Sequence, residues 1–128
     1  MRLSMIFVLF SLLIAACSPS GTNSNEPLPP GDAARGAELF TQSIGGAPSC
    51  DTCHTLDGTV RVGPSLQGYA AIAPDHAGDA SVEDYTYTSI VRPAAHIVEG
   101  FGNVMYPQYG RQLTQQQIAD LIAYLLTL

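Results

Sequence analysis

The pattern of hydrophobic and polar positions predicts one strong helix at the C-terminal end of the chain. Four apolar residues recur there at the i, i+3, i+4, i+7 spacing of a single helix face: Ile118, Leu121, Ile122 and Leu125. Thr114 and Gln117 precede them with the spacing of a capping box, in which each residue satisfies a backbone N–H of the first turn. The helix should therefore begin directly after Thr114.

Two more helices are predicted upstream. The first begins after Asp32, a residue type suited to cap a helix N-terminus, and runs to about Gln42. The second begins at Ser81 and ends before Pro93, because the residue that precedes a proline resists helical geometry. Residues 69–79 show no convincing periodicity and predict a loop or a short helix.

Glycine- and proline-rich stretches separate these segments, notably residues 43–49 and 93–111. Strand-like alternation is nearly absent, so we expect an all-α fold of three to four helices. A folded region of about 98 residues, from 31 to 128, has a small core of its own. A large buried cofactor would supply much of the apolar interior that the side chains cannot.

Residues 1–16 have the pattern of an export signal. Arg2 precedes an almost unbroken apolar run that ends at Ala16 and is too short to span a bilayer comfortably. The segment Ile14-Ala15-Ala16-Cys17 resembles a bacterial lipoprotein lipobox, which implies cleavage before Cys17 and a lipid on its thiol. The alternatives are a spare thiol beside an ordinary cleavage site, or an uncleaved anchor. In each case the folded part lies outside the cytoplasm, in the periplasm or at the outer cell surface.

Residues 17–30 are expected to form a lipid-anchored flexible tether, because residues 18–30 are polar and rich in proline and serine. Removal of the signal leaves four arginines against eleven carboxylates, a formal charge of −7, and the chain has no lysine. Such a surface repels nucleic acid and anionic lipid head groups. We therefore expect the lipid on Cys17, and no basic patch, to hold the protein at the membrane.

The motif Cys50-Asp51-Thr52-Cys53-His54 carries the most specific chemistry. Cys-x-x-Cys-His in an exported protein is typical of c-type haem attachment, with two thioethers to the porphyrin and the histidine as an axial iron ligand. A structural zinc site would need a second pair of ligands, and the only other cysteine is Cys17. A thioredoxin-like motif would follow a strand, and this pair has no strand-rich flank. The plainest alternative is a surface disulfide beside a coincidental histidine.

The sixth iron ligand is predicted to be Met105, the only methionine left after signal removal. A thioether favours reduced iron, and Pro107 stiffens the loop that would hold it. A lone methionine is otherwise ordinary core filler. His96 is the main competitor for the iron, although we expect both His96 and His76 to be exposed or locally bonded.

With these residues in place, the chain from about residue 31 to 128 resembles a class I cytochrome c, a monohaem electron carrier. The family's crossing of its N- and C-terminal helices is matched by Gly36 and Phe40 in the first helix and by Leu121 and Tyr124 in the last. Gly63-Pro64-Ser65-Leu66 is similar to the family's segment after the haem motif. The resemblance implies that the Pro64 carbonyl accepts a hydrogen bond from the ring of His54, which orients the ligand.

The resemblance implies one haem c, attached through Cys50 and Cys53 and ligated by His54 and Met105, in an electron carrier rather than an enzyme. Residues 89–105 are also similar to the cytochrome c domain of some oxidase second subunits, which points to partners in a membrane oxidase or reductase. A permanent subunit of a larger complex and an open-site haem enzyme or gas sensor remain alternatives. Four residues are candidates to bond the haem propionates, or else surface groups: Arg61, Arg92, Tyr85 and Tyr87.

Overall fold

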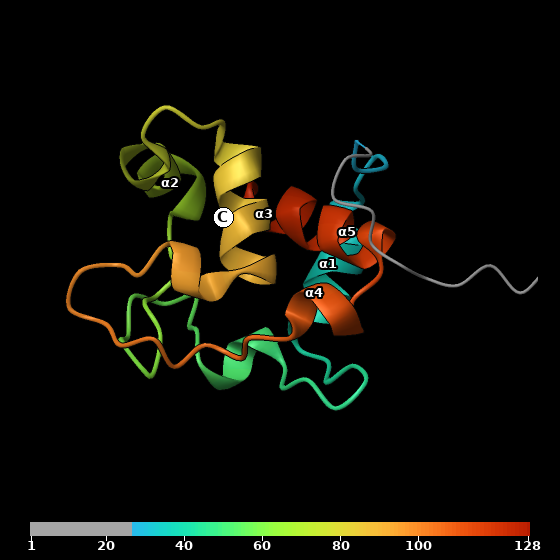
Figure 1. Cartoon of the computed structure of the whole chain (residues 1–128), viewed down its shortest axis with the longest axis horizontal. Helices are drawn as coiled ribbons and strands as arrows, with labels where there is room; N and C mark the ends of the chain where they lie inside the picture. The colour runs from blue at the N-terminus through green and yellow to red at the C-terminus, as the bar shows by residue number, and fades with distance from the viewer. Residues whose placement is uncertain (1–26) are drawn as a thin grey trace, which may run out of the picture.

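The computed structural model describes residues 27–128, and within that range it is entirely helical (Figure 1). The five α-helices are α1 (Ala33–Phe40), α2 (Tyr69–Ala77), α3 (Val82–Val91), α4 (Tyr109–Gln112) and α5 (Gln115–Leu125). Two short 3₁₀ turns, Cys50–Thr52 and Pro93–Ala95, complete the elements. The predicted signal peptide, Cys17 and most of the predicted tether lie outside the described residues.

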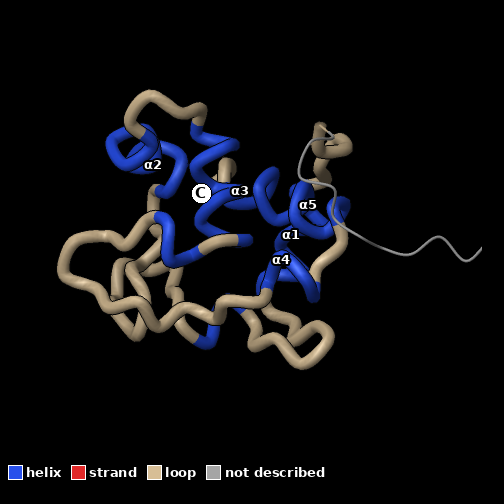
Figure 2. The backbone as a smooth tube through the Cα atoms, in the orientation of Figure 1, coloured by secondary structure: helices blue, strands red, loops and turns tan. Residues whose placement is uncertain are grey.

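The prediction of an all-α fold is confirmed, although the number of helices was too low. Residues 69–77 form α2, the short helix that was one of two alternatives for this segment, and the single turn α4 begins inside the glycine- and proline-rich stretch 93–111. Long loops without strands connect the helices over residues 27–128 (Figure 2). None of the helices in this range is long and apolar enough to cross a membrane.

The crossing of α1 and α5 organises one side of the molecule (Figure 1). A Cβ atom at Gly36 would overlap the carbonyl oxygen of Asp120, so only glycine allows the two backbones to approach this closely. The ring of Phe40 meets that of Tyr124 edge to face, with centroids 5.7 Å apart. Leu121 is buried beneath this contact. The four residues carry the helix crossing that the resemblance implies.

A buried carboxylate ties the same two helices together. Asp120 on α5 is 2% exposed and accepts hydrogen bonds from the backbone N–H of Asp32 at 2.8 Å and from Gln116 Nε2 at 2.9 Å. Arg35 on α1 donates to it through Nε at 2.9 Å and Nη2 at 3.0 Å. These bonds hold the pKa of Asp120 down at about 2, chiefly through the Arg35 guanidinium.

The helices α2 and α3 form the other side of the molecule. Ser81 caps α3 by accepting a hydrogen bond from the N–H of Asp84, as its position predicts. The two helices are joined by a buried hydrogen bond of 2.8 Å between the hydroxyls of Tyr69 and Thr86. After α3 the chain makes a long excursion, drawn in orange in Figure 1, before it returns to α4. This excursion contains Met105.

The N-terminal edge of the described chain already packs on the domain. Leu28 is partly buried against the core, and the Pro30 carbonyl accepts a hydrogen bond of 2.8 Å from Gln116. The contacts with α5 thus begin inside the segment that we predict as a tether.

Candidate functional site

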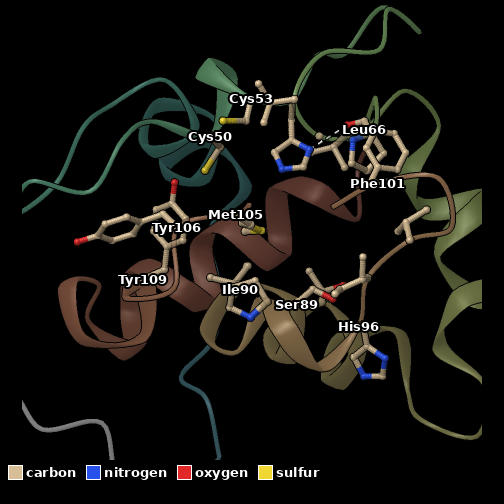
Figure 3. A pocket seen from close by; sticks show the side chains of 18 of the residues that line it. Cys50, Cys53, Leu66, Ser89, Ile90, His96, Phe101, Met105, Tyr106 and Tyr109 are labelled. Atoms are coloured by element: carbon tan, nitrogen blue, oxygen red, sulfur yellow. Dashed lines mark hydrogen bonds between the residues drawn. The ribbon is translucent and has the colours of Figure 1, made fainter. Parts of the chain in front are cut away.

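A cavity of about 460 Å³ opens between the helices and the loops that connect them. Side chains from all five α-helices line it, among them Phe40, Tyr69, Ile90, Tyr109 and Leu121. Its volume lies within the usual range for small-molecule and cofactor sites, and its lining is mostly apolar, as such sites are. Figure 3 shows part of the lining at close range.

The cysteine motif forms one wall of this cavity. The 3₁₀ turn Cys50–Thr52 winds the backbone so that the N–H groups of Cys53 and His54 both donate to the Cys50 carbonyl, at 3.1 and 2.9 Å. Both thiols are free, and Figure 3 shows them side by side at the cavity. Burial raises the pKa of Cys50 to about 11, so its sulfur is a protonated thiol at neutral pH.

The structure shows the predicted contact between His54 and Pro64. Nδ1 of His54 lies 2.9 Å from the Pro64 carbonyl oxygen, and because a carbonyl can only accept, Nδ1 carries the proton. This leaves the Nε2 lone pair of a half-buried ring free to bind a metal. A Cβ at Gly63 would come within 2.5 Å of His54 Cε1, so glycine is needed for the backbone to pass the ring.

Met105 lines the same cavity as the cysteine motif and is packed against the core. In Figure 3 its sulfur lies between the two cysteines and the residues of α3. Pro107, two positions later, also lines the cavity. Sequence reasoning missed Tyr109, which holds this part of the chain in place: its hydroxyl donates to the Pro48 carbonyl at 2.8 Å. Burial raises the pKa of Tyr109, so the phenol stays a donor.

The remaining candidates divide into two groups. Tyr85, His76 and His96 all line the cavity, and both histidines are solvent-exposed. Of the four residues considered for propionate bonding, Tyr85 alone lines the cavity. Arg61 instead donates to the Asp51 carbonyl at 3.1 Å. Within residues 27–128 no three or more histidine, cysteine or acidic side chains gather as a metal-binding cluster.

These residues fit a covalently attached haem. Two thiols with Cys-x-x-Cys spacing, an imidazole with a free nitrogen and a thioether all line one mostly apolar cavity. The thiols suit thioether formation with the porphyrin, while the imidazole and the methionine sulfur are a known axial pair for haem iron. The apolar lining suits the faces of a macrocycle.

The model of the family "Cytochrome c" matches residues 33–128, three quarters of the chain. The chain therefore belongs to the cytochrome c family, which confirms the identification made from the sequence. Membership implies haem c as the cofactor and haem-based electron transfer as the activity, and Cys50 and Cys53 have the family's Cys-x-x-Cys-His spacing. No curated protein matches the chain.

Proposed function

We propose that this member of the cytochrome c family is a membrane-tethered carrier with a single haem. It would pass single electrons between extracytoplasmic or membrane partners of a respiratory or photosynthetic chain. The observation that carries this proposal is that His54 and Met105 line one cavity together with both thiols. A site with two protein ligands for one iron suits electron transfer, whereas substrate turnover or gas binding needs an open position.

Each residue of the site has a distinct task. Cys50 and Cys53 would hold the haem by two thioethers, and His54 would bind the iron through Nε2 while Pro64 fixes its orientation. Met105 would supply the second iron ligand, and a thioether favours the reduced state more than a second imidazole does. The haem supplies the one-electron chemistry. The chain positions it and limits its contact with water.

The Met105→Ala variant tests the carrier proposal. Reduced wild-type protein should bind carbon monoxide poorly at neutral pH, whereas the variant should bind it readily and show a changed spectrum and a lower reduction potential. Val104→Ala is the matched control, since Val104 lines the same cavity and carries no ligand atom. If the reduced wild type binds carbon monoxide readily, or if the spectrum of Met105→Ala equals that of the wild type, the result would instead support an open-site haem enzyme or gas sensor.

The membrane attachment rests on residues 1–30. The export signal, the lipobox-like segment before Cys17 and the polar tether would place the domain close to a membrane on its outer side. Tethering raises the effective concentration of a carrier beside a membrane oxidase or reductase. Cys17→Ser should release the protein into the soluble fraction, whereas Ser18→Ala should leave it bound. Retention of Cys17→Ser at the membrane would argue for another kind of anchor.

The negative net charge and the lack of lysine limit how partners dock. A ring of lysines around the haem edge cannot supply the contact, so recognition must use other surface groups. A permanent subunit of a larger oxidoreductase is the second candidate, favoured by the similarity of residues 89–105 to oxidase-linked domains. Detergent extraction distinguishes the two, because a subunit should always copurify with stoichiometric partners and a mobile carrier should not.

A further inference from the structure

Four polar side chains gather on one part of the cavity, and we call them the polar cluster. They are His76 from α2, Tyr85 and Ser89 from α3, and His96 from the excursion after α3. The Tyr85 ring neighbours both imidazoles: its centroid is 6.3 Å from that of His76, nearly parallel, and 5.3 Å from that of His96, edge to face. Tyr85 is buried, whereas both imidazoles reach solvent.

Ser89 shows that this region is built for a polar ligand. Its hydroxyl oxygen is buried and has no hydrogen-bond partner in the structure, although the residue lines the cavity. Ser89 follows Tyr85 by four residues, so the two share one face of α3. Because a buried hydroxyl without a partner is unfavourable, the orphaned oxygen points to a hydrogen-bonding group on the ligand that the cavity takes.

The polar cluster lies away from the attachment cysteines. Figure 3 shows Cys50 and Cys53 at one end of the cavity and His96 at the other, with Met105 between them. In a haem, the two positions that form thioethers and the two propionate carboxylates lie toward opposite edges of a rigid macrocycle. A haem attached at the cysteines would therefore present its carboxylates on the side of the polar cluster.

We propose that the polar cluster binds the haem propionates and that its two imidazoles take up protons as the site is reduced, so that the reduction potential depends on pH. The proposal rests on the proposed function, since it requires the attached haem as the redox centre. The electron comes from the redox partner or electrode, and the proton passes from solvent to a ring nitrogen of His76 or His96. With the proton bound, the net charge of the site changes less upon reduction than it would through the electron alone.

The sign of the coupling follows from electrostatics. Each electron adds one unit of negative charge, and an imidazole that faces this charge binds its proton more tightly. Among side chains, only histidine in its ordinary state changes charge between about pH 5 and 8. The other charged side chains on the elements that meet here are Asp75, Asp79, Glu83, Asp84, Arg92 and Glu99.

Potentiometry on the purified haem-loaded protein tests the proposal. Between about pH 5 and 8 the wild-type potential should fall as pH rises, with a slope limited to about 59 mV per pH unit for one proton per electron. The double variant His76→Gln/His96→Gln should lose the slope. Glu99→Gln is the matched control: it removes a charge from the same excursion and should shift the potential without removing its pH dependence.

A second measurement needs no variant. Proton NMR of the two imidazoles should show each ring titrating at a higher pH in the reduced protein than in the oxidised protein. Equal titration in both states, a flat wild-type potential or an unchanged slope in the double variant would each overturn the proposal. These equilibrium readings need only an attached haem, so they remain informative even if the carbon monoxide test refutes the carrier function.

Discussion

The substitution Asp120→Asn tests the buried latch between α1 and α5. Asparagine keeps the shape of the side chain and removes its charge. One of its terminal atoms can still accept the N–H of Asp32, as the Oδ1 atom of Asp120 does at 2.8 Å. The other becomes an NH₂ group at the position of Oδ2, where it meets the Nε–H of Arg35, a donor now 2.9 Å away. Two donors then face each other.

The size of the effect follows from these contacts. A hydrogen bond to a charged group contributes about 1.5–3 kcal/mol. The Arg35 side chain is 54% exposed, so it can turn toward water and recover part of the loss. We therefore expect the free energy of unfolding of the haem-loaded protein to fall by about 2 kcal/mol. For a domain of this size, that corresponds to a Tm lower by roughly 10 °C.

Thermal and denaturant unfolding followed by circular dichroism measure this change, with Asp79→Asn as the matched control. Asp79 is exposed, so the same substitution there should change stability by less than about 0.5 kcal/mol. Arg35→Gln completes a double-mutant cycle with Asp120→Asn. The two changes should be clearly non-additive, since either one breaks the same ion pair.

The pH dependence supplies a second check. The pKa of Asp120 is about 2 in the folded protein and near 3.9 in an unfolded chain. A lowered folded-state pKa stabilises the fold above the unfolded value, and this contribution disappears as pH falls from about 5 through about 2. The wild type and Asp120→Asn should therefore converge in stability in this window. A loss no larger than that of Asp79→Asn, or a difference that stays constant down to pH 2, would refute the reasoning.

Three further substitutions probe the helix crossing, the histidine and the last helix. Gly36→Ala should lower the free energy of unfolding by about 2 kcal/mol or more in denaturant titrations, because the overlap of its Cβ with the Asp120 carbonyl outweighs the gain of up to about 1 kcal/mol in helix propensity. Equal stability would show that the backbones can separate at no cost. Gly63→Ala should displace the His54 ring and weaken the hydrogen bond from its Nδ1 to the Pro64 carbonyl. Because the imidazole then becomes a less basic iron ligand, the reduction potential measured by potentiometry should rise. A potential unchanged from the wild type would contradict this role. Thr114→Ala removes one half of the capping box and should cost about 1 kcal/mol, seen as a Tm lower by roughly 4–8 °C.

The strongest elements could be predicted because their signals are local. The capping box at Thr114 and Gln117 and the apolar face after it specify α5 without reference to the rest of the chain. The haem motif is equally local, since its three functional residues lie within five positions of one another. The prediction of Met105 as the sixth ligand has another basis, because it is the only methionine left after removal of the predicted signal. Asp32 likewise caps α1 as its position predicts, by accepting from the N–H groups of Ala34 and Arg35.

The sequence left the region of α2 open between a loop and a short helix, because the packing of this helix depends on small residues. Its buried positions are Tyr69, Ala73 and Ala77, spaced four apart. Apolar residues at its less buried positions, such as Ile72, hide this periodicity, and Pro74 within the helix suggests a break. The exposed Ile72 lines the cavity, so its apolar character serves the cofactor site and not the protein core.

The latch and the polar cluster required tertiary information. Asp120 is a buried polar residue within the apolar part of α5, and its partner Arg35 is 85 residues away in the sequence. His76, Tyr85 and His96 likewise belong to three separate segments whose approach depends on how α2, α3 and the excursion pack. From the sequence, Asp120 and Arg35 have no predicted role. His96 is predicted only as a competitor for the iron and Tyr85 only as one of four propionate candidates, because partners so distant leave no local pattern.

The cavity shows how closely this fold depends on its cofactor. An apolar cofactor bound in the cavity of about 460 Å³ would bury apolar surface and so stabilise the fold. Val62, Ile97 and Val104 line the cavity while remaining 49–63% exposed, and an apolar macrocycle would cover part of their surface. The two thioethers predicted at Cys50 and Cys53 would therefore attach the group that completes the core, and the same covalent step would fix the redox centre and stabilise the fold.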